Sequence, residues 1–329
     1  MRGPVDPIVD LSVVVPVYNE EGNLPDLLRR LVAVLEANGG AWELVFVDDG
    51  SHDGSLELLR KAAEENPRIR VVEFNRNYGQ HKAVFAGMLE SRGAVVATLD
   101  ADLQNPPEEL PKLLAKIREG YDVVGGLRAK RRDTLFRRLA SFMNNRMMSI
   151  ATGVRMRDYG CMMRAYRRDV VDSIVDCGEI PTYIPALANL YAKRIVEVET
   201  AHAERTRGRS KYNLKGLLRL WLDLLTGFSV LPLRLVSFLG LFTAILGLGF
   251  SLFLIVRRLV IGPEAEGLFT LFAILFFFVG AQILGVGILG EYIGRVFAEV
   301  RRRPRFVVRR VHGRPPPADG AIAPGKEAP

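Results

Sequence analysis

The chain has only two cysteines, Cys161 and Cys177, among 329 residues. They form no Cys-x-x-Cys pair and show no spacing typical of a zinc site. So few cysteines in a chain of this length argue against a disulfide scaffold. The cysteine content fits a reducing, cytosolic setting.

Glycine-rich phosphate loops are also missing. No Gly-x-Gly-x-x-Gly follows the first predicted strand, and the Gly-x-x-x-x-Gly-Lys-[Ser/Thr] pattern is absent. This gives little support to a dinucleotide-dependent oxidoreductase or a P-loop enzyme. Groups other than a glycine loop must neutralise any bound phosphate.

Charged residues are absent from two long stretches. The chain is 25% charged with a mean hydropathy of +0.12, yet residues 235–256 and 268–290 contain no Asp, Glu, Lys or Arg. At 1.5 Å per residue, each stretch is long enough to span a bilayer as a helix. Gln282 is the main polar residue within them, and the lack of acids and bases argues against an ion-coupled transporter. The sequence therefore predicts two transmembrane helices.

Basic residues flank this pair of predicted spans. The nine on the outer flanks are Lys211, Lys215, Arg219, Arg234, Arg295, Arg301, Arg302, Arg303 and Arg305. The positive-inside rule places both flanks in the cytoplasm and residues 257–267 on the opposite side. Arg257 and Arg258 oppose this orientation, but two acidic residues share their loop. Small residues such as Gly240 and Gly285 favour helix packing, so we expect a homo-oligomer.

We divide the chain into four regions. Residues 1–210 form a cytoplasmic domain, 211–232 an amphipathic juxtamembrane helix, 233–294 the transmembrane hairpin, and 295–329 a basic cytoplasmic segment with a disordered tail. An ordinary helix packed on the soluble domain is the alternative for residues 211–232. The first apolar run, after Asp10, is too short for a signal peptide.

β-rich runs alternate with helical patterns in the first region. The predicted strands are 12–17, 44–47, 71–74, 95–99 and 122–125, and the predicted helices are 24–35, 55–65, 80–90 and 108–117. This order predicts an α/β fold with a mostly parallel sheet. Ligands then bind beyond the carboxyl ends of the strands.

Acidic motifs follow two of these strands. Asp48-Asp49-Gly-Ser ends the second, and Asp100-Ala-Asp102-Leu-Gln104 ends the fourth. Two carboxylates one residue apart can hold a hard divalent ion together with nucleotide phosphate oxygens, with the Gln104 carbonyl as a further ligand. The alternative is a solvated acidic turn. We favour a Mg²⁺ or Mn²⁺ site because both motifs lie at strand ends.

Several motifs together resemble the GT-A (Rossmann-like) nucleotide-sugar glycosyltransferases of family 2. They are PVYNEE (16–21), VDDGSHDGS (47–55), NRNYGQHKAVFAGM (75–88) and DADLQNPPEE (100–109). The two C-terminal spans match the branch of polyisoprenyl-phosphate glycosyltransferases. Later stretches at 157–174, 183–189, 202–214 and 288–308 resemble the members that transfer 4-deoxy-4-formamido-L-arabinose to undecaprenyl phosphate, the precursor step for modifying lipid A.

The resemblance implies roles for individual residues. The nucleotide-sugar site would comprise Pro16, Tyr18, Glu20, Asp48, Asp100 and Arg128, and Asp100, Asp102 and Gln104 would hold the metal against the UDP diphosphate. Arg205, Arg207, Ser210 and Lys211 would meet phosphates of donor and lipid. A solvated basic face, or a contact with anionic lipid, is the alternative for this last group.

Two residues resemble general bases. His81 begins a predicted helix, where a capping or surface role is the better interpretation. Asp158 matches a position proposed as the base in related enzymes. Because a phosphate monoester with a second pKa of about 6 is already anionic at neutral pH, we expect Asp158 to position an arginine or the sugar instead.

The implied reaction is an inverting single displacement by undecaprenyl phosphate on a UDP-sugar, with catalytic roles for Asp100, Asp102, Asp158 and Arg205. It takes place at the bacterial inner membrane, with no nucleic-acid partner. Transfer of glucose, N-acetylglucosamine or mannose to a polyprenyl phosphate is the alternative. A processive synthase lacks support because Gln-x-x-Arg-Trp is absent. A scaffold or flippase fits the acidic motifs poorly.

Overall fold

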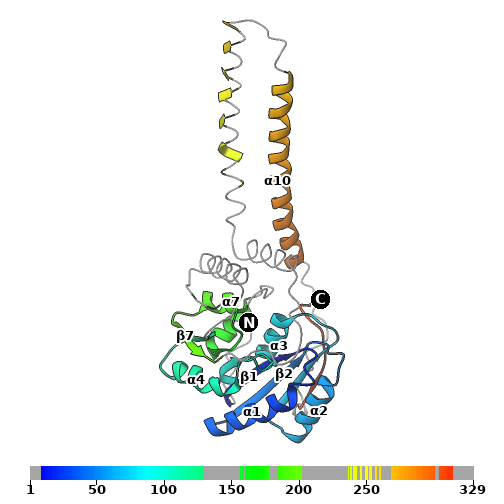
Figure 1. Cartoon of the computed structure of the whole chain (residues 1–329), viewed down its shortest axis with the longest axis vertical. Helices are drawn as coiled ribbons and strands as arrows, with labels where there is room; N and C mark the ends of the chain where they lie inside the picture. The colour runs from blue at the N-terminus through cyan, green and yellow to red at the C-terminus, as the bar shows by residue number, and fades with distance from the viewer. Residues whose placement is uncertain are drawn as a thin grey trace. The chain divides into compact units, whose positions relative to one another are not determined.

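Figure 1 shows the computed structural model of the chain. It describes residues 9–128, 156, 158, 160–177, 184–201, 268–300 and 304–313, with scattered helical positions between 236 and 260. The chain divides into two compact units. The first comprises Met1–Lys211 together with Pro304–Pro329, and the second comprises Tyr212–Arg303.

The first unit is built on a mixed eight-stranded sheet with the order β7-β5-β6-β4-β1-β2-β3-β8. Its strands are β1 (Val9–Val17), β2 (Trp42–Asp48), β3 (Ile69–Phe74), β4 (Gly93–Thr98), β5 (Val123–Arg128), β6 (Arg164–Arg167), β7 (Ile195–Thr200) and β8 (Val308–His312). The pairs β1–β2, β1–β4, β2–β3 and β5–β7 are parallel. The prediction of an α/β fold with a mostly parallel sheet is confirmed.

Helices cover both faces of the sheet (Figure 1). The helices are α1 (Leu24–Asn38), α2 (Ser55–Glu65), α3 (Gln80–Glu90), η1 (Pro107–Glu109), α4 (Leu110–Arg118), α6 (Arg168–Asp176) and α7 (Ile184–Tyr191). Alternate β1 residues, from Leu11 to Val17, share one apolar cluster with α1, α2 and α4. Val14, between them, faces α3, where a Cβ on Gly87 would lie 2.2 Å from its Cγ1. Glycine at position 87 therefore allows α3 to lie directly on the sheet.

Among the described elements, the strands β6, β7 and β8 and the helices α6 and α7 were not predicted. β6 and β8 are antiparallel to their neighbours, and β7 lies parallel to β5. β8 was predicted only as part of a basic segment, whereas it extends the sheet beside β3. The predicted disordered tail lies outside the described residues after Gly313.

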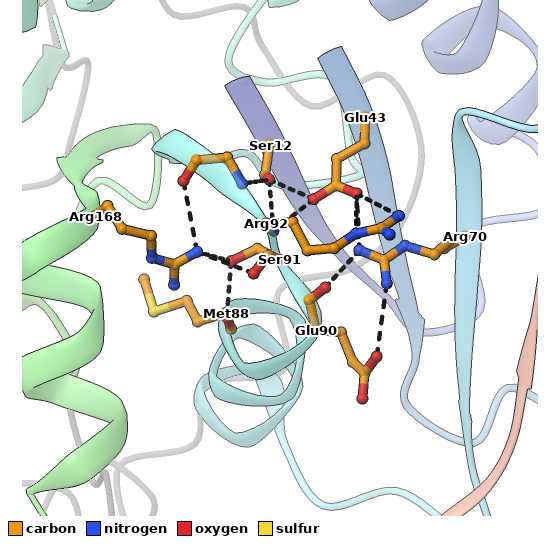
Figure 2. Close-up of polar contacts among 9 residues, drawn as sticks. Ser12, Glu43, Arg70, Met88, Glu90, Ser91, Arg92 and Arg168 are labelled. Atoms are coloured by element: carbon orange, nitrogen blue, oxygen red, sulfur yellow. Dashed lines mark hydrogen bonds and ion pairs between the residues drawn. The ribbon is translucent and has the colours of Figure 1, made fainter. Parts of the chain in front are cut away.

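A polar network lies at the amino ends of the central strands (Figure 2). Glu43 of β2 accepts hydrogen bonds from Ser12 Oγ at 2.6 Å, the Arg92 amide at 2.7 Å and Arg70 Nη2 at 2.8 Å. Arg168 Nη1 donates to the Ser91 carbonyl at 2.9 Å. This amino-end network, defined by Ser12, Glu43, Arg70, Ser91, Arg92 and Arg168, fixes the connection between α3 and β4 to the sheet.

The second unit contains the long helix α10 (Leu268–Val300), which includes the second predicted span. A Cβ on Gly285 would lie 3.3 Å from Val236 Cγ1 of the preceding helical segment, so the two segments pack closely. Large apolar side chains on both segments are exposed, among them Phe238, Leu271 and Ile283. Within the described part of the chain, no helix is both long and apolar enough to cross a membrane. The predicted helix at 211–232 lies outside the described residues.

Candidate functional site

Asp48 and Asp49, at the carboxyl end of β2, are both buried but have different partners. Asp49 accepts hydrogen bonds from the backbone amides of Tyr78, at 2.6 Å, and Gly79, at 2.9 Å. Asp48 accepts one from the Ser51 amide at 3.3 Å through Oδ2, whereas its Oδ1 has no hydrogen-bond partner among the described residues. Burial raises the pKa of both carboxyl groups. Asp49 therefore shapes a loop, and Asp48 retains an acceptor for a ligand.

Asp100 and Asp102 follow β4 at the same edge of the sheet. Burial, together with the neighbouring carboxylates of Asp102 and Glu20, raises the pKa of Asp100 to about 7, although Arg128 and Gln80 counteract this. Gln80 Nε2 donates a hydrogen bond to Asp100 Oδ1. This crowding of acids produces a local negative potential that favours a cation.

The geometry of the Asp100–Gln104 turn suits a shared metal site. Asp102 Oδ1 accepts a hydrogen bond from the Gln104 amide at 3.1 Å, and Leu103 between them adopts a positive φ of 60°. Among the described residues, no cluster of three or more acidic, histidine or cysteine side chains could hold a metal. Mg²⁺ is commonly bound by one or two carboxylates plus substrate phosphates, which is the donor set this turn offers. The residues present therefore fit a metal completed by a diphosphate.

Arg128, the last residue of β5, forms a two-pronged ion pair with Asp158. Its Nε lies 2.6 Å from Asp158 Oδ2 and its Nη2 lies 2.7 Å from Oδ1. Both side chains are largely buried, and the Asp158 amide donates to Glu197 Oε1 at 2.8 Å. Asp158 therefore orients Arg128, whose charge also acts on Asp100.

The first loop brings its predicted residues to the same edge of the sheet. Pro16 lies in β1, and Tyr18 makes an edge-on ring contact with His52 at 6.4 Å. The Glu20 amide donates to Ser55 Oγ at 2.9 Å, and its carboxylate adds to the negative charge around Asp100. The structure thus brings together the predicted residues from β1, β2, β4 and β5. Arg205, Arg207, Ser210 and Lys211 lie outside the described residues.

Sequence reasoning missed three residues of this region. Asp49 lies in the motif at 47–55 and Gln80 in the motif at 75–88, but the resemblance to the family implies no role for either residue. Arg164 is fully buried and donates to the backbone carbonyls of Cys161, at 2.9 Å, and Asp158, at 3.1 Å. No sequence pattern distinguished Arg164 from the neighbouring surface arginines.

His81 lies in the first turn of α3, where no side-chain cap is formed. Burial and the charge of Arg164 lower its pKa to about 4. His81 is therefore neutral at physiological pH. The residue is half-buried, and its predicted capping or surface role stays a prediction.

Comparison with known proteins gives consistent matches. Residues 12–175 match the family described as glycosyl transferase family 2. The chain is 51% identical over 312 residues to an undecaprenyl-phosphate 4-deoxy-4-formamido-L-arabinose transferase of Klebsiella pneumoniae subsp. pneumoniae, covering 94% of this chain and 95% of that one. A protein of the same description from Salmonella paratyphi A is 52% identical over 308 residues, covering 93% and 94%.

Solved structures are more distant. Glucosyl-3-phosphoglycerate synthase from Mycobacterium tuberculosis, in complex with Mn²⁺, uridine diphosphate and phosphoglyceric acid, is 19% identical with a TM-score of 0.48. The match covers 67% of this chain and 77% of that one.

Proposed function

Because this chain belongs to glycosyltransferase family 2, among the undecaprenyl-phosphate 4-deoxy-4-formamido-L-arabinose transferases, we propose that it transfers this sugar from UDP to undecaprenyl phosphate. The observation that carries the proposal is an identity of about half with these transferases over nearly the whole chain. The reaction would supply the lipid-linked sugar for lipid A modification and hence for polymyxin resistance.

The proposed donor site uses the Asp48 oxygen to which no described residue donates a hydrogen bond. A uracil base offers one ring N–H donor, and a buried carboxylate oxygen without a partner is a strong acceptor for it. Pro16, Tyr18 and Glu20 would line the base and ribose from the first loop. The neutral His81 adds no charge to this site.

Asp100, Asp102 and Gln104 would hold Mg²⁺ or Mn²⁺ beside the diphosphate. When bound, the metal would neutralise charge that develops on the departing UDP. Arg128, held in place by Asp158, would contribute positive charge on the same side as Asp100. Electrostatic stabilisation and positioning would then supply most of the catalysis.

The proposed displacement needs no covalent intermediate with the enzyme. A lipid phosphate oxygen would form a bond to the anomeric carbon as the bond from that carbon to the UDP oxygen breaks, which inverts the configuration. UDP leaves with the bonding electron pair. Since the phosphate is mostly dianionic above pH 7, no proton has to be removed. Both oxygens of Asp158 contact Arg128, which supports a positioning role.

The acceptor would be bound close to the bilayer. Arg205, Arg207, Ser210 and Lys211 precede the predicted amphipathic helix in the sequence, and such groups suit a lipid phosphate. We propose that the protein is anchored in the bacterial inner membrane by spans near 235–256 and 268–290, as a homo-oligomer with both termini cytoplasmic.

The activity can be tested with the purified full-length chain in detergent. Radiolabelled UDP-4-deoxy-4-formamido-L-arabinose and undecaprenyl phosphate should yield a labelled lipid, with turnover that disappears in EDTA and returns with Mn²⁺. UDP-glucose, UDP-N-acetylglucosamine and, with dolichol phosphate, GDP-mannose serve as competing donors. Faster transfer of one of these would replace the proposed substrate.

The orientation can be tested by labelling in spheroplasts. A cysteine at Ala265, in a variant with Cys161 and Cys177 replaced, should react with an impermeant maleimide added outside. A cysteine at Ala321 should react only after lysis. The reverse pattern would contradict the proposed orientation.

A further inference from the structure

The segment 304–312 follows α10 in the chain and is attached to β3 of the first unit. β8 pairs antiparallel with Val71–Phe74, and the Val307 carbonyl accepts a hydrogen bond from the Asn75 amide at 3.2 Å. Glu73, whose side chain is 3% exposed, contacts His312 Nε2 at 2.9 Å and Arg309 Nη1 at 3.3 Å. Backbone pairing and a buried carboxylate therefore both anchor this segment, which we call the C-terminal strap.

Aromatic contacts extend the strap toward the carboxyl end of β3. Phe306 stacks on Phe74 with ring centroids 4.9 Å apart and an interplanar angle of 22°, and it contacts Phe85 of α3 at 6.4 Å. The guanidinium of Arg305 lies 4.8 Å from the centre of the Phe85 ring. The strap thus contacts both β3 and α3.

The loop between these two elements, residues 75–79, borders the acidic site. Tyr78 packs edge-on against Phe74 at 5.5 Å, and its amide and that of Gly79 donate to Asp49. The next residue, Gln80, donates to Asp100. Phe74 is therefore in contact with Phe306 on one side and with the loop that places Gln80 on the other.

We propose that Phe306 is a positioning residue for the donor site. By packing on Phe74 and Phe85, it holds the 75–79 loop and the start of α3, so that Gln80 orients the Asp100 carboxylate. This inference rests on the proposed function for the role of Asp100, but the ordering of the loop by Phe306 does not depend on it. The strap is then part of the donor site although it follows the last long helix in the sequence.

The test compares Phe306→Ala with Val307→Ala in the full-length chain. Val307 is the neighbouring residue, its side chain is 44% exposed, and its backbone bond to Asn75 survives the substitution. Phe306→Ala should weaken UDP binding in the presence of Mn²⁺ by about tenfold, as expected for an interaction of 1.4 kcal/mol. Amide exchange in residues 75–82 should accelerate, while exchange in the amino-end network stays unchanged. Phe306→Tyr should retain the wild-type UDP affinity and the wild-type amide exchange in residues 75–82. Val307→Ala should alter neither quantity.

Phe306→Leu serves if the alanine variant fails to fold, because it retains apolar contact but loses ring stacking. Unchanged amide exchange in residues 75–82 and unchanged UDP affinity in the folded variant would overturn the inference. Failure of the proposed function gives a different result. In that case wild type would form no labelled lipid from the UDP-sugar and undecaprenyl phosphate, whereas the effect of Phe306→Ala on amide exchange in the loop would persist.

Discussion

Strand β2 carries a buried carboxylate at each end, and the two differ in their partners. Glu43, at the amino end, accepts hydrogen bonds from a hydroxyl, a backbone amide and an arginine, and a second arginine lies 3.4 Å away. Asp48, five positions later, has an oxygen without a hydrogen-bond partner in the described part of the chain, and burial raises the pKa of its carboxyl group. The same strand therefore has a compensated charge at one end and an uncompensated one at the other.

The difference separates stability from function in this sheet. Compensated groups at the amino ends contribute to folding because their desolvation is offset by hydrogen bonds. Uncompensated groups at the carboxyl ends cost stability, and the proposed UDP-sugar and metal would supply their missing partners. A buried carboxylate that lacks hydrogen-bond partners thus indicates a site, whereas one with a full set of partners, such as Glu43 or Asp49, indicates structure.

The strongest test of this comparison removes Glu43. Glu43→Ala leaves Arg70, which is buried, with only the more distant Glu90 carboxylate at 3.7 Å, so the free energy of unfolding should fall by about 3 kcal/mol. Glu36→Ala is the matched control, because its ion pair with Arg68 is exposed and contributes about 0–1 kcal/mol. Guanidinium unfolding of the full-length chain in mild detergent measures both. Equal losses in the two variants would contradict a structural role for the amino-end network.

Asp102→Ala tests the role of the residues at the carboxyl ends of the strands. Turnover should fall at least about a hundredfold, since a metal contributes several kcal/mol to transition-state stabilisation. The free energy of unfolding should fall by no more than about 1 kcal/mol, because the only described hydrogen bond that is lost is the one from the Gln104 amide. Asp26→Ala, on α1 with a side chain that is 44% exposed, controls for loss of a carboxylate and should retain full activity. Full turnover of wild type in EDTA would exclude the proposed metal.

The sequence predicted the elements whose apolar pattern is strong and local. Helices α2 and α3 have the predicted bounds, and α1 and the five predicted strands differ by a few residues at their ends. β6 and β8 were missed because they are short and rich in arginine, and each forms through pairing with a strand distant in sequence. Local propensity carries little information about such strands.

The candidate site also contains residues that local sequence patterns predict and residues that depend on contacts between distant segments. Asp48, Asp100 and Asp102 could be predicted because acidic motifs at strand ends must meet at one edge of a parallel sheet. The sequence predicted that Asp158 positions an arginine or the sugar, but it did not identify Arg128 as the partner, because the pair joins two segments 30 residues apart and depends on the position of β5. Likewise, nothing in the sequence indicates that Phe306 reaches Phe74.

Asp158 is a carboxylate whose charge is compensated by Arg128, although it lies near the proposed site. Variants of this pair test whether Asp158 contributes to catalysis by positioning Arg128. Asp158→Asn keeps one acceptor for Arg128, so kcat/KM should fall only about tenfold, a loss of 1.4 kcal/mol. Arg128→Gln should cost a similar factor, and the double variant should cost little more than either if the pair acts as a unit.

The pH profile of kcat distinguishes this role from general-base catalysis. Between about pH 6 and 9, the profiles of wild type and Asp158→Asn should have the same shape. A limb that disappears in Asp158→Asn, with a loss of about ten-thousandfold at neutral pH, would identify Asp158 as the base.

Asp48→Asn should have the smallest effect, and it should act on stability and binding in opposite directions. Burial raises the pKa of Asp48 above the ordinary 3.8, so the folded state retains its proton to higher pH than the unfolded state does. Below the ordinary value both states are protonated, and the carboxyl group costs nothing. As the pH rises through that value toward the raised one, the unfolded state ionises first, so wild type loses stability. Asparagine does not titrate, so the variant should match wild type at about pH 3 and exceed it in free energy of unfolding at pH 7.

UDP binding to Asp48→Asn should weaken about fivefold, because a neutral acceptor replaces a charged one at a cost of about 1 kcal/mol. Calorimetry with UDP and unfolding measured at both pH values test these expectations, and a variant less stable than wild type at pH 7 would show that the Asp48 charge is compensated after all.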